Sequence, residues 1–269
     1  AVEGVTAREP GSTRLMVDQV ARGQAAVCIM AQQVGMDVHV VNTGVKGGPF
    51  DVAGVRDAPL GEGTGNILQG PAMSSDLLYR AMRTGRRIGA EGDWQVMGFS
   101  DLAVGNSASA SIIAHRLTGA PLTDVIGRGK SMDGTGLLRK AEALEAANAR
   151  VPESLGPERA LGEYGGFEMA MMTGAMLGAA EAGRIILVDG FVASVSALAA
   201  AQLMPETRAA MILCQASLEP GYAHILDALG ARSVLDLDNS VAQGTGAALT
   251  WPILRAAVAM FNELPDSQT

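Results

Sequence analysis

Residues 184–194 read RIILVDGFVAS, in which four aliphatic side chains are followed directly by Asp189 and Gly190. An uninterrupted aliphatic run that ends at a polar residue and a glycine predicts a buried strand that stops at a turn. Two other segments, 95–99 and 209–215, have the same pattern of a short apolar run before polar residues. These runs favour a parallel sheet.

Helical patterns separate these strands, so strands and helices alternate along the chain. One helix is predicted from Ser12 or Thr13 to about Val34, followed by a mostly apolar strand within 36–45 that reads as buried on both faces. A methionine-rich helix after Gly166 is interpreted as core packing. Further helices are predicted at 74–90, from Asn106, at 137–150, at 224–229 and after 246, and the short segment 233–240 precedes the last of these.

The composition agrees with a single large α/β domain. Hydrophobic residues make up 48% of the 269 residues but aromatic residues only 4%, so the core must be aliphatic. The net charge of −8 argues against non-specific binding to nucleic acid or to an anionic membrane. No apolar run reaches the roughly 18–20 residues that span a bilayer, and no signal-peptide pattern is present.

Cys28 and Cys214 both lie in apolar segments. They are interpreted as buried free thiols in a reducing cytoplasm. No spacing of cysteine and histidine resembles a metal site. The sequence also lacks a Walker A motif, a dinucleotide fingerprint and a nucleophile elbow.

Polar residues and glycines gather just after the predicted strands. Because ligands bind at the carboxyl ends of parallel strands, five segments are expected to converge there. These are Asp101 with Asn106 and Ser107, the 127–130 loop with Lys140, Asp189 with Gly190, Ser217 with Glu219, and 243–246.

Backbone N–H groups at 105–107 and at 244–246 are candidates for an anion cradle at a helix N-terminus, with Lys130 or Lys140 as the countercharge. Each glycine read alone is more often only a tight turn. Asp101 is a candidate base or orienting carboxylate, and a helix N-cap is an equally good reading of it.

Eight segments occur in the order and at the spacing of one known family, and the resemblance covers almost the whole chain. The segments are EGVTA (3–7), GTGNILQGPAM (63–73), SDLAVGNS (100–107), GRGK (127–130), GGFEMA (165–170), LVDGF (187–191), SLEPG (217–221) and QGTGAAL (243–249). The chain thus resembles the nicotinate-nucleotide–dimethylbenzimidazole phosphoribosyltransferases, which activate the lower-ligand base of cobamides.

The resemblance implies a Rossmann-like parallel sheet flanked by helices, with a small helical domain built from the chain ends. It implies transfer of phosphoribose from nicotinate mononucleotide to an aromatic base with inversion at C1, giving an α-ribotide and free nicotinate. No cofactor and no metal are implied.

The resemblance also implies roles for individual residues. Asp101 matches a glutamate of the family, Ser217 matches a substrate-lining serine, and the acceptor pocket includes Leu102 and Val241. The phosphate site is expected at Val104, Gly105, Asn106, Ser107, Gly127, Gly129 and Lys140, and further substrate contacts are expected at Gly190, Gly244 and Gly246.

Gln243 is the main departure from the family pattern, which has a glutamate there that is taken as the general base. A neutral amide can orient a substrate or a water molecule but cannot accept the proton. Ala242 and Gln215 also depart from the pattern, which has glycine and commonly histidine at these places.

The glutamine at 243 leaves three hypotheses for the function of the chain. The chain is an active transferase with an unusual acceptor, benzimidazole or phenolic, in which Asp101 or an activated water replaces the missing base. Alternatively, it is a catalytically silent subunit that supports a homologous active partner in a heterodimer. A nucleotide-binding protein without transferase activity is the third reading, and the retained phosphate site disfavours it.

The expected organisation is an α/β domain at 1–250 and a helix at 251–269 that joins the small helical domain, without the family's N-terminal segment. A cytoplasmic homodimer or heterodimer is expected, with no nucleic acid and no membrane as partner.

Overall fold

The computed structural model describes residues 3–9, 11–127, 133–237 and 243–264. Its main sheet contains β3 (Val96–Phe99), β4 (Ile185–Val188), β5 (Met211–Gln215) and β6 (Ser233–Leu235). The four strands are all parallel and lie side by side in sequence order. The parallel α/β sheet that the aliphatic runs predict is therefore confirmed.

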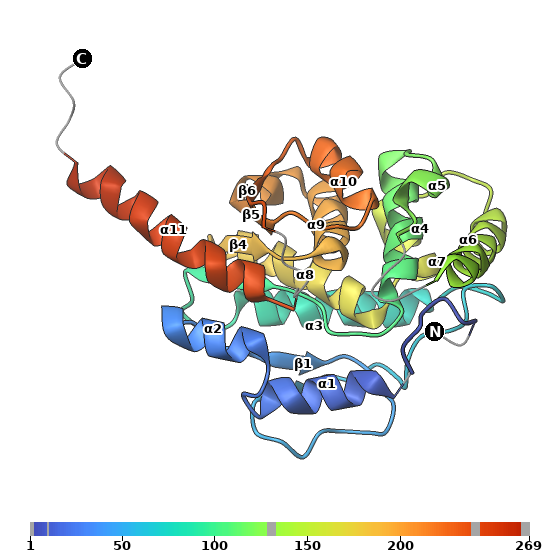
Figure 1. The fold of residues 1–269 in the computed structure, drawn as a ribbon, viewed down its shortest axis with the longest axis horizontal. Helices are drawn as coiled ribbons and strands as arrows, with labels where there is room; N and C mark the ends of the chain where they lie inside the picture. Colours follow the sequence, from blue (N-terminus) through green and yellow to red (C-terminus); the bar gives the residue numbers. More distant parts are fainter. Residues whose placement is uncertain (1–2, 10, 128–132, 238–242, 265–269) are drawn as a thin grey trace.

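Helices connect these strands and cover the sheet (Figure 1). The predicted helix starts at 74 and 106 agree with the structure to within one residue, and the helix predicted at 137 begins one turn earlier. The helices from the third onward are α3 (Ser75–Ala90), α4 (Asn106–Thr118), α5 (Leu122–Val125), α6 (Gly134–Ala149), α7 (Pro157–Tyr164), α8 (Phe167–Glu181), α9 (Phe191–Leu203), the 3-10 helix η1 (Pro205–Ala210), α10 (Gly221–Leu229) and α11 (Thr245–Glu263).

Both faces of β4 are covered from Ile186 to Val188, and alternate side chains of this strand pack into different cores. Ile186 and Val188 belong to the large core that includes residues of α4, α8 and α9. Leu187 faces the other way and packs with Cys214 and with Ala247 of α11. Burial on both faces thus holds for three residues of the aliphatic run, while Ile185 at the start of the strand is exposed.

The first part of the chain differs from its prediction. The helix predicted from residue 12 to about 34 is two helices, α1 (Ser12–Ala21) and α2 (Ala26–Val34). Gly23 breaks the pattern with a φ of +73°, a conformation that an α-helix does not contain. The prediction of one continuous helix was wrong because apolar periodicity does not register this turn.

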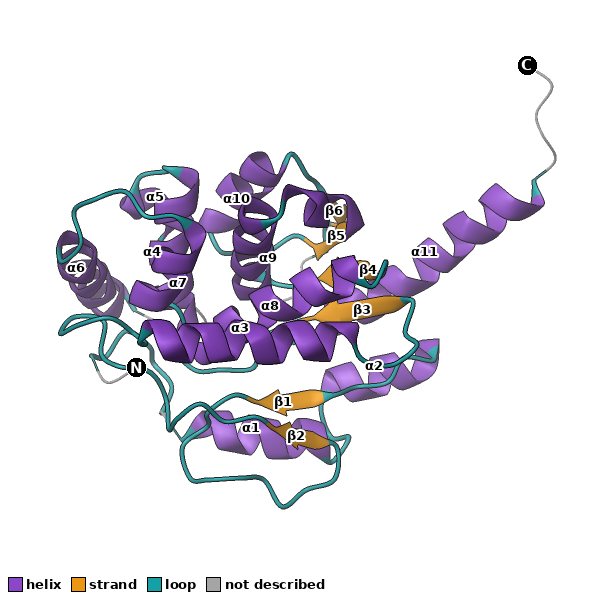
Figure 2. Ribbon diagram, turned by 180° about the vertical axis from the view of Figure 1, so that it is seen from behind, coloured by secondary structure: helices purple, strands orange, loops and turns teal. Residues whose placement is uncertain are grey.

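The strand predicted within 36–45 is also shorter than expected. Only β1 (Val40–Asn42) forms, and it pairs in parallel with β2 (Val55–Asp57) in a separate two-stranded sheet. Of the three residues of β1 only Asn42 is buried, so burial on both faces was wrong here. This small sheet lies with α1 below the main body in Figure 2.

Helices α3 and α8 pack through glycines on both sides of their contact (Figure 2). A Cβ atom at Gly85 would lie 1.9 Å from the carbonyl oxygen of Met171, and one at Gly174 would lie 2.1 Å from that of Met82. The next glycine along each helix makes the same approach, at 1.9 and 2.0 Å. The backbones touch directly, so these positions admit no side chain. The four glycines are Gly85, Gly89, Gly174 and Gly178.

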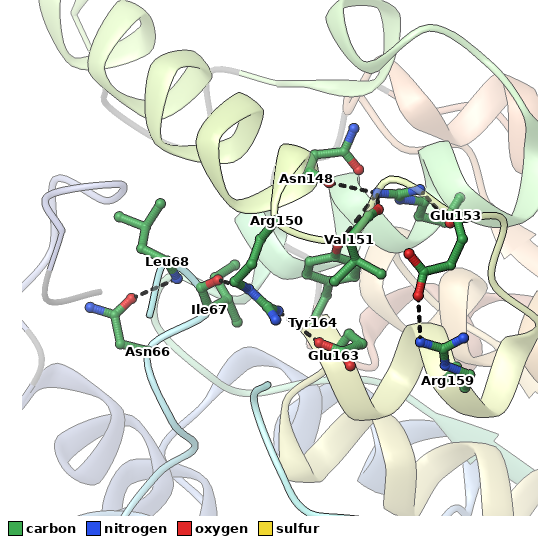
Figure 3. Close-up of polar contacts among 11 residues, drawn as sticks. Asn66, Ile67, Leu68, Asn148, Arg150, Val151, Glu153, Arg159, Glu163 and Tyr164 are labelled. Atoms are coloured by element: carbon green, nitrogen blue, oxygen red, sulfur yellow. Dashed lines mark hydrogen bonds and ion pairs between the residues drawn. The ribbon is translucent and has the colours of Figure 1, made fainter. Parts of the chain in front are cut away.

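The C-terminal end of α6 is fixed by a polar network around Tyr164 (Figure 3). Arg116 donates to the carbonyl oxygen of Asn148 at 2.7 Å, and Arg150 donates to the carboxylate of Glu163 at 2.7 Å. Both guanidinium groups lie 5.8 Å from the centroid of the Tyr164 ring. The network joins α6 to α4 and α7 and so sets the position of the whole helix.

Helix α11 runs without interruption from 245 to 263 and packs against α2, with its far half extending away from the body (Figure 1). The predicted boundary at residue 250 therefore falls inside a continuous helix. In the parts of the chain that the structure describes, no helix has both the length and the apolarity needed to cross a membrane.

Candidate active site

The carboxyl ends of three neighbouring strands carry the polar residues of the site. Asp101 follows β3 by two residues, Asp189 follows β4 directly, and Ser217 follows β5 by two residues. The backbone N–H of Asp189 donates to the carbonyl oxygen of Phe99 at 3.0 Å, which extends the pairing of β3 and β4. The structure places these residues at one edge of the sheet, as the sequence predicts.

Lys140 reaches this edge from α6 and is almost fully buried, with 1% of its surface exposed. Its Nζ atom donates to the carbonyl oxygen of Gly127 at 2.9 Å and to Oγ of Ser107 at 3.3 Å. Burial lowers the pKa of Lys140, and the negative charge of Glu219 partly opposes this effect. A buried ammonium beside the first turn of α4 is a suitable partner for a phosphate.

The carboxylate of Glu219 packs against the backbone of Gly127, so a side chain at 127 would force this carboxylate to move. A Cβ atom at Gly127 would lie 1.8 Å from Oε2 of Glu219. Ser217 is part of the same corner, where its Oγ accepts a hydrogen bond from the backbone N–H of Glu219 at 3.3 Å. Gly105 begins α4 with a φ of +84°, which explains the glycine at that helix start.

Asn106 brings two carboxylates together. Its Nδ2 atom donates to Oδ2 of Asp101 at 2.9 Å and lies 3.4 Å from Oε1 of Glu168 at the start of α8. Loss of solvent and the negative charge of Asp101 raise the pKa of Glu168. Asp101 lies four residues before the Gly105 cap of α4 and makes no cap of that helix.

Sequence reasoning missed Glu168 as a site residue, although it lies in the GGFEMA segment. The glycine pair before Glu168 was the signal in the sequence. In the structure, a Cβ atom at Gly166 would lie 2.3 Å from both carboxylate oxygens of Glu168. A glycine there leaves room for the carboxylate to turn back towards Asn106.

Asp189 fixes the turn that precedes α11. Its Oδ2 atom accepts hydrogen bonds from the backbone N–H groups of Gly244 at 2.9 Å and of Gly246 at 3.1 Å. The anion cradle that the sequence predicts at 244–246 is therefore filled by the protein's own carboxylate. That prediction was wrong because nothing in the sequence shows that Asp189 reaches these two donors.

The ionisation of Asp189 is strongly affected by its position. Only 2% of its surface is exposed. Burial raises its pKa to about 6, the two backbone hydrogen bonds oppose this rise, and the charge of Asp101 adds to it. The carboxyl group therefore changes charge close to neutral pH.

Gln243 sits on the same turn in an unusual backbone conformation. Its φ of +74° makes it the one non-glycine residue with a positive φ in the described part of the chain. Strain of this kind is concentrated at functional sites. Its Nε2 atom lies 3.7 Å from the sulfur of Met16, so α1 covers the turn.

Helix α1 is joined to the site by a second contact. The backbone N–H of Val104 donates to Oγ1 of Thr13 at 3.2 Å. Sequence reasoning missed Thr13 and Met16, because no motif connects the start of the chain with residues more than ninety positions away.

Three predicted residues, Gly129, Val241 and the alternative countercharge Lys130, lie outside the described residues. Leu102 is half-buried beside Asp101, and Gly190 begins α9 with a φ of +93°. Within the described ranges, no group of three or more His, Cys, Asp or Glu residues could hold a metal ion. Cys28 and Cys214 are free, with Cys214 buried and Cys28 half-buried.

All 269 residues match the sequence model of a family described as "Phosphoribosyltransferase". The chain belongs to this family. It is 39% identical to the nicotinate-nucleotide–dimethylbenzimidazole phosphoribosyltransferase of Dechloromonas aromatica (strain RCB), over 100% of this chain and 79% of that protein. The corresponding protein of Cupriavidus necator is 38% identical over 97% of this chain and 76% of its own length.

Solved structures agree with this membership. The structure titled CobT from Thermus thermophilus has a TM-score of 0.92 and 37% identity, covering 97% of this chain and 79% of that one. A second structure, of the nicotinate-nucleotide–dimethylbenzimidazole phosphoribosyltransferase from the same organism, has a TM-score of 0.90 and 36% identity, over 97% of this chain and 78% of that one. The family and the fold that the eight motifs predict are thus confirmed.

Proposed function

We propose that this phosphoribosyltransferase moves the phosphoribosyl group of nicotinate mononucleotide to an aromatic base of the benzimidazole or phenol type, in cobamide biosynthesis. The observation that carries the proposal is Lys140, a buried ammonium held at the N-terminus of α4 by Ser107 and Gly127. It supports binding of the phosphate at the strand edge where Asp101 and the Gln243 turn also lie.

In the proposed reaction, the phosphate is held by Lys140, Ser107 and the backbone around Gly105. A ring atom or hydroxyl oxygen of the acceptor attacks C1 of the ribose on the face opposite the nicotinate. The bond between C1 and the pyridine nitrogen breaks, its electron pair returns to that nitrogen, and nicotinate leaves. The product is an α-ribotide.

Asp101 and Gln243 have different proposed roles. A neutral acceptor must lose a proton as it reacts, and the amide of Gln243 cannot accept it. Asp101, directly or through a water molecule, is the proposed proton acceptor for such a base, and Asn106 and Glu168 position it. Leu102, Gly190, Ser217, Gly244 and Gly246, with Gly129 and Val241, are proposed to line the substrates.

Gln243 also favours a second candidate function. Without the general base, the chain would serve as a catalytically silent subunit beside a homologous active one. The same assay separates the two candidates.

The purified chain is incubated with nicotinate mononucleotide and either 5,6-dimethylbenzimidazole or phenol, and release of nicotinate is measured. We expect release, and we expect Lys140→Met to raise the KM for the mononucleotide by about ten- to a hundredfold, the effect of losing a charge-assisted hydrogen bond. Lys46→Met, at an exposed position, is the matched control. Binding of the mononucleotide without release, with activity restored by a homologous partner, would establish the silent subunit. No binding at all would contradict both candidates.

The proposal includes assembly of this chain in the cytoplasm, either as a homodimer or as a heterodimer with a homologous subunit. Its support is the apolar end of α11, where Phe261 is 89% exposed and Val258, Met260 and Leu264 are each more than half exposed. Sedimentation of the purified chain, compared with Phe261→Lys, tests this assembly. A sedimentation coefficient of a monomer at all concentrations would contradict the proposed homodimer.

A further inference from the structure

Two hydrogen-bond donors converge on the sulfur of Met16. Nη1 of Arg8 lies 3.2 Å from this sulfur, and Nε2 of Gln243 lies 3.7 Å from it. Arg8 in the N-terminal loop and Met16 in α1 are only eight residues apart, whereas tertiary folding brings the turn that carries Gln243 to them across 227 residues.

A thioether is a weak acceptor, and two strong donors are poorly matched by it. In the described part of the chain, no ion pair joins the Arg8 guanidinium to a carboxylate. Arg8 and its contact with Met16 are exposed, so the place beside Gln243 carries an accessible positive charge and two side-chain donors. A negatively charged group bound there would form the strong hydrogen bonds that Met16 cannot provide.

The loop that carries Arg8 is fixed close to this place. The backbone N–H of Arg8 donates to Oγ1 of Thr6 at 3.2 Å, and that of Ser12 donates to the carbonyl oxygen of Glu9 at 3.0 Å. Helix α1 is in turn held to the site by the bond between Thr13 and Val104. These hydrogen bonds restrict the backbone that carries Arg8, so its guanidinium stays near the turn of Gln243.

We propose that the acceptor of this phosphoribosyltransferase binds as an aromatic anion, held by the guanidinium of Arg8 and the amide of Gln243. This inference rests on the proposed function and names its acceptor class. An acceptor that has lost its proton in solution needs no general base, so a glutamine at 243 is sufficient.

The step balances without a proton transfer. A lone pair of the anionic oxygen or ring nitrogen forms the bond to C1 of the ribose. The bond from C1 to the pyridine nitrogen breaks, and its electron pair neutralises the pyridinium. Nicotinate leaves with its carboxylate, and no group of the protein changes its protonation.

Among the described residues, Asp189 bonds directly to the turn, and the charge of Asp101 acts on both Asp189 and Glu168. Burial and the charge of Asp101 raise the pKa values of Glu168 and Asp189, which reduces the negative charge that an anionic acceptor meets. Because the pKa of Asp189 is about 6, the pH dependence that reports on the acceptor is measured above that pH.

The test compares phenol with 2,6-difluorophenol, which has nearly the same shape but a lower hydroxyl pKa. Calorimetry measures binding of each to the full chain saturated with nicotinate mononucleotide, and nicotinate release is followed in parallel. We expect tighter binding of difluorophenol, strengthening as the pH rises through the pKa of its hydroxyl. Arg8→Met should weaken this binding by about ten- to a hundredfold and Arg8→Lys by much less.

Binding of the mononucleotide should be the same in Arg8→Met and in the wild type, and Arg22→Met, at an exposed position of the same region, is the matched control. Arg8-dependent binding of difluorophenol without any nicotinate release would overturn the proposed function but support the anionic acceptor. Equal binding of the two phenols, no effect of Arg8→Met, or no binding of either phenol would overturn the anionic acceptor, whether or not nicotinate is released with benzimidazole.

Discussion

Asp189 accepts a hydrogen bond from the backbone N–H of Gly244, with 2.9 Å between Oδ2 and the nitrogen. This bond joins the end of β4 to the start of α11 and spans 55 residues of sequence. It holds the turn next to Gln243 against the strand edge where Asp101 lies. The position of Gln243 thus depends on a carboxylate that takes part in no step of the proposed reaction.

The first prediction concerns the pH dependence of stability through Asp189. Its pKa is about 6 in the folded chain, against an ordinary value of 3.8. Between these values the folded state keeps a proton that the unfolded state has released, so this carboxyl group lowers stability as the pH rises from about 4 to 6. A difference of this size corresponds to roughly 3 kcal/mol.

Asp189→Asn removes this titration because the amide stays neutral. The free energy of unfolding of the wild type minus that of the variant should therefore fall by roughly 3 kcal/mol as the pH rises from about 4 to about 7. Urea unfolding at a series of pH values measures the difference. Parallel curves for the two proteins would contradict the assignment of a raised pKa to Asp189.

The second prediction concerns Gly246 in the same turn. A Cβ atom there would lie 2.2 Å from Oδ1 of Asp189 and 3.0 Å from Cβ of Gln215. Gly246→Ala should lower stability by roughly 1–3 kcal/mol and reduce nicotinate release, because the turn has to move. In Gly70→Ala, where no atom lies within 4 Å of the added Cβ, the change should stay within about 0.5 kcal/mol. Thermal unfolding and the nicotinate assay report the two effects, and equal behaviour of both variants would show that the turn tolerates a side chain.

The third prediction concerns the contact of α3 with α8. Gly174→Ala places a methyl group 2.1 Å from the carbonyl oxygen of Met82, a backbone atom that cannot rotate away. The helices must separate, and we expect the free energy of unfolding to fall by roughly 1–3 kcal/mol. Gly134→Ala, with open space around its Cβ, is the matched helical control and should leave stability unchanged or slightly higher. Urea unfolding measures both variants. A Gly174→Ala variant as stable as the wild type would mean that the two backbones are not in contact.

The fourth prediction concerns the missing general base. Gln243→Glu places a carboxylate beside Met16 and should raise nicotinate release with 5,6-dimethylbenzimidazole, up to the roughly 10²–10⁴-fold that a general base contributes. The variant should also lose the preference for ionised acceptors, because the carboxylate pairs with Arg8. Steady-state rates with benzimidazole and with 2,6-difluorophenol measure both changes. An unchanged rate with benzimidazole would mean that further parts of the acceptor site have diverged.

Much of the fold could be predicted from the chain alone. The aliphatic residues at 186–188 are buried because both faces of β4 are covered there, and the glycines at 105 and 244 precede helices whose starts need a positive φ. Local patterns carry this information because the periodicity of a strand and the conformation of a glycine are properties of neighbouring residues. Periodicity failed at 22–25, where Gly23 divides an apparently continuous helix, and at β1, which pairs outside the main sheet.

The candidate site could be predicted only in part. The sequence by itself determined the family, the parallel sheet and the polar residues that follow its strands, including Asp101 and the departure at Gln243. Only the tertiary structure decided which groups meet: Asp189 fills the cradle at Gly244, Glu168 joins Asp101 through Asn106, and Arg8 reaches Gln243 across Met16. The physical reason is that a hydrogen bond depends on positions in space to within a few tenths of an ångström. Residues from distant parts of the chain acquire such positions only when the core has packed.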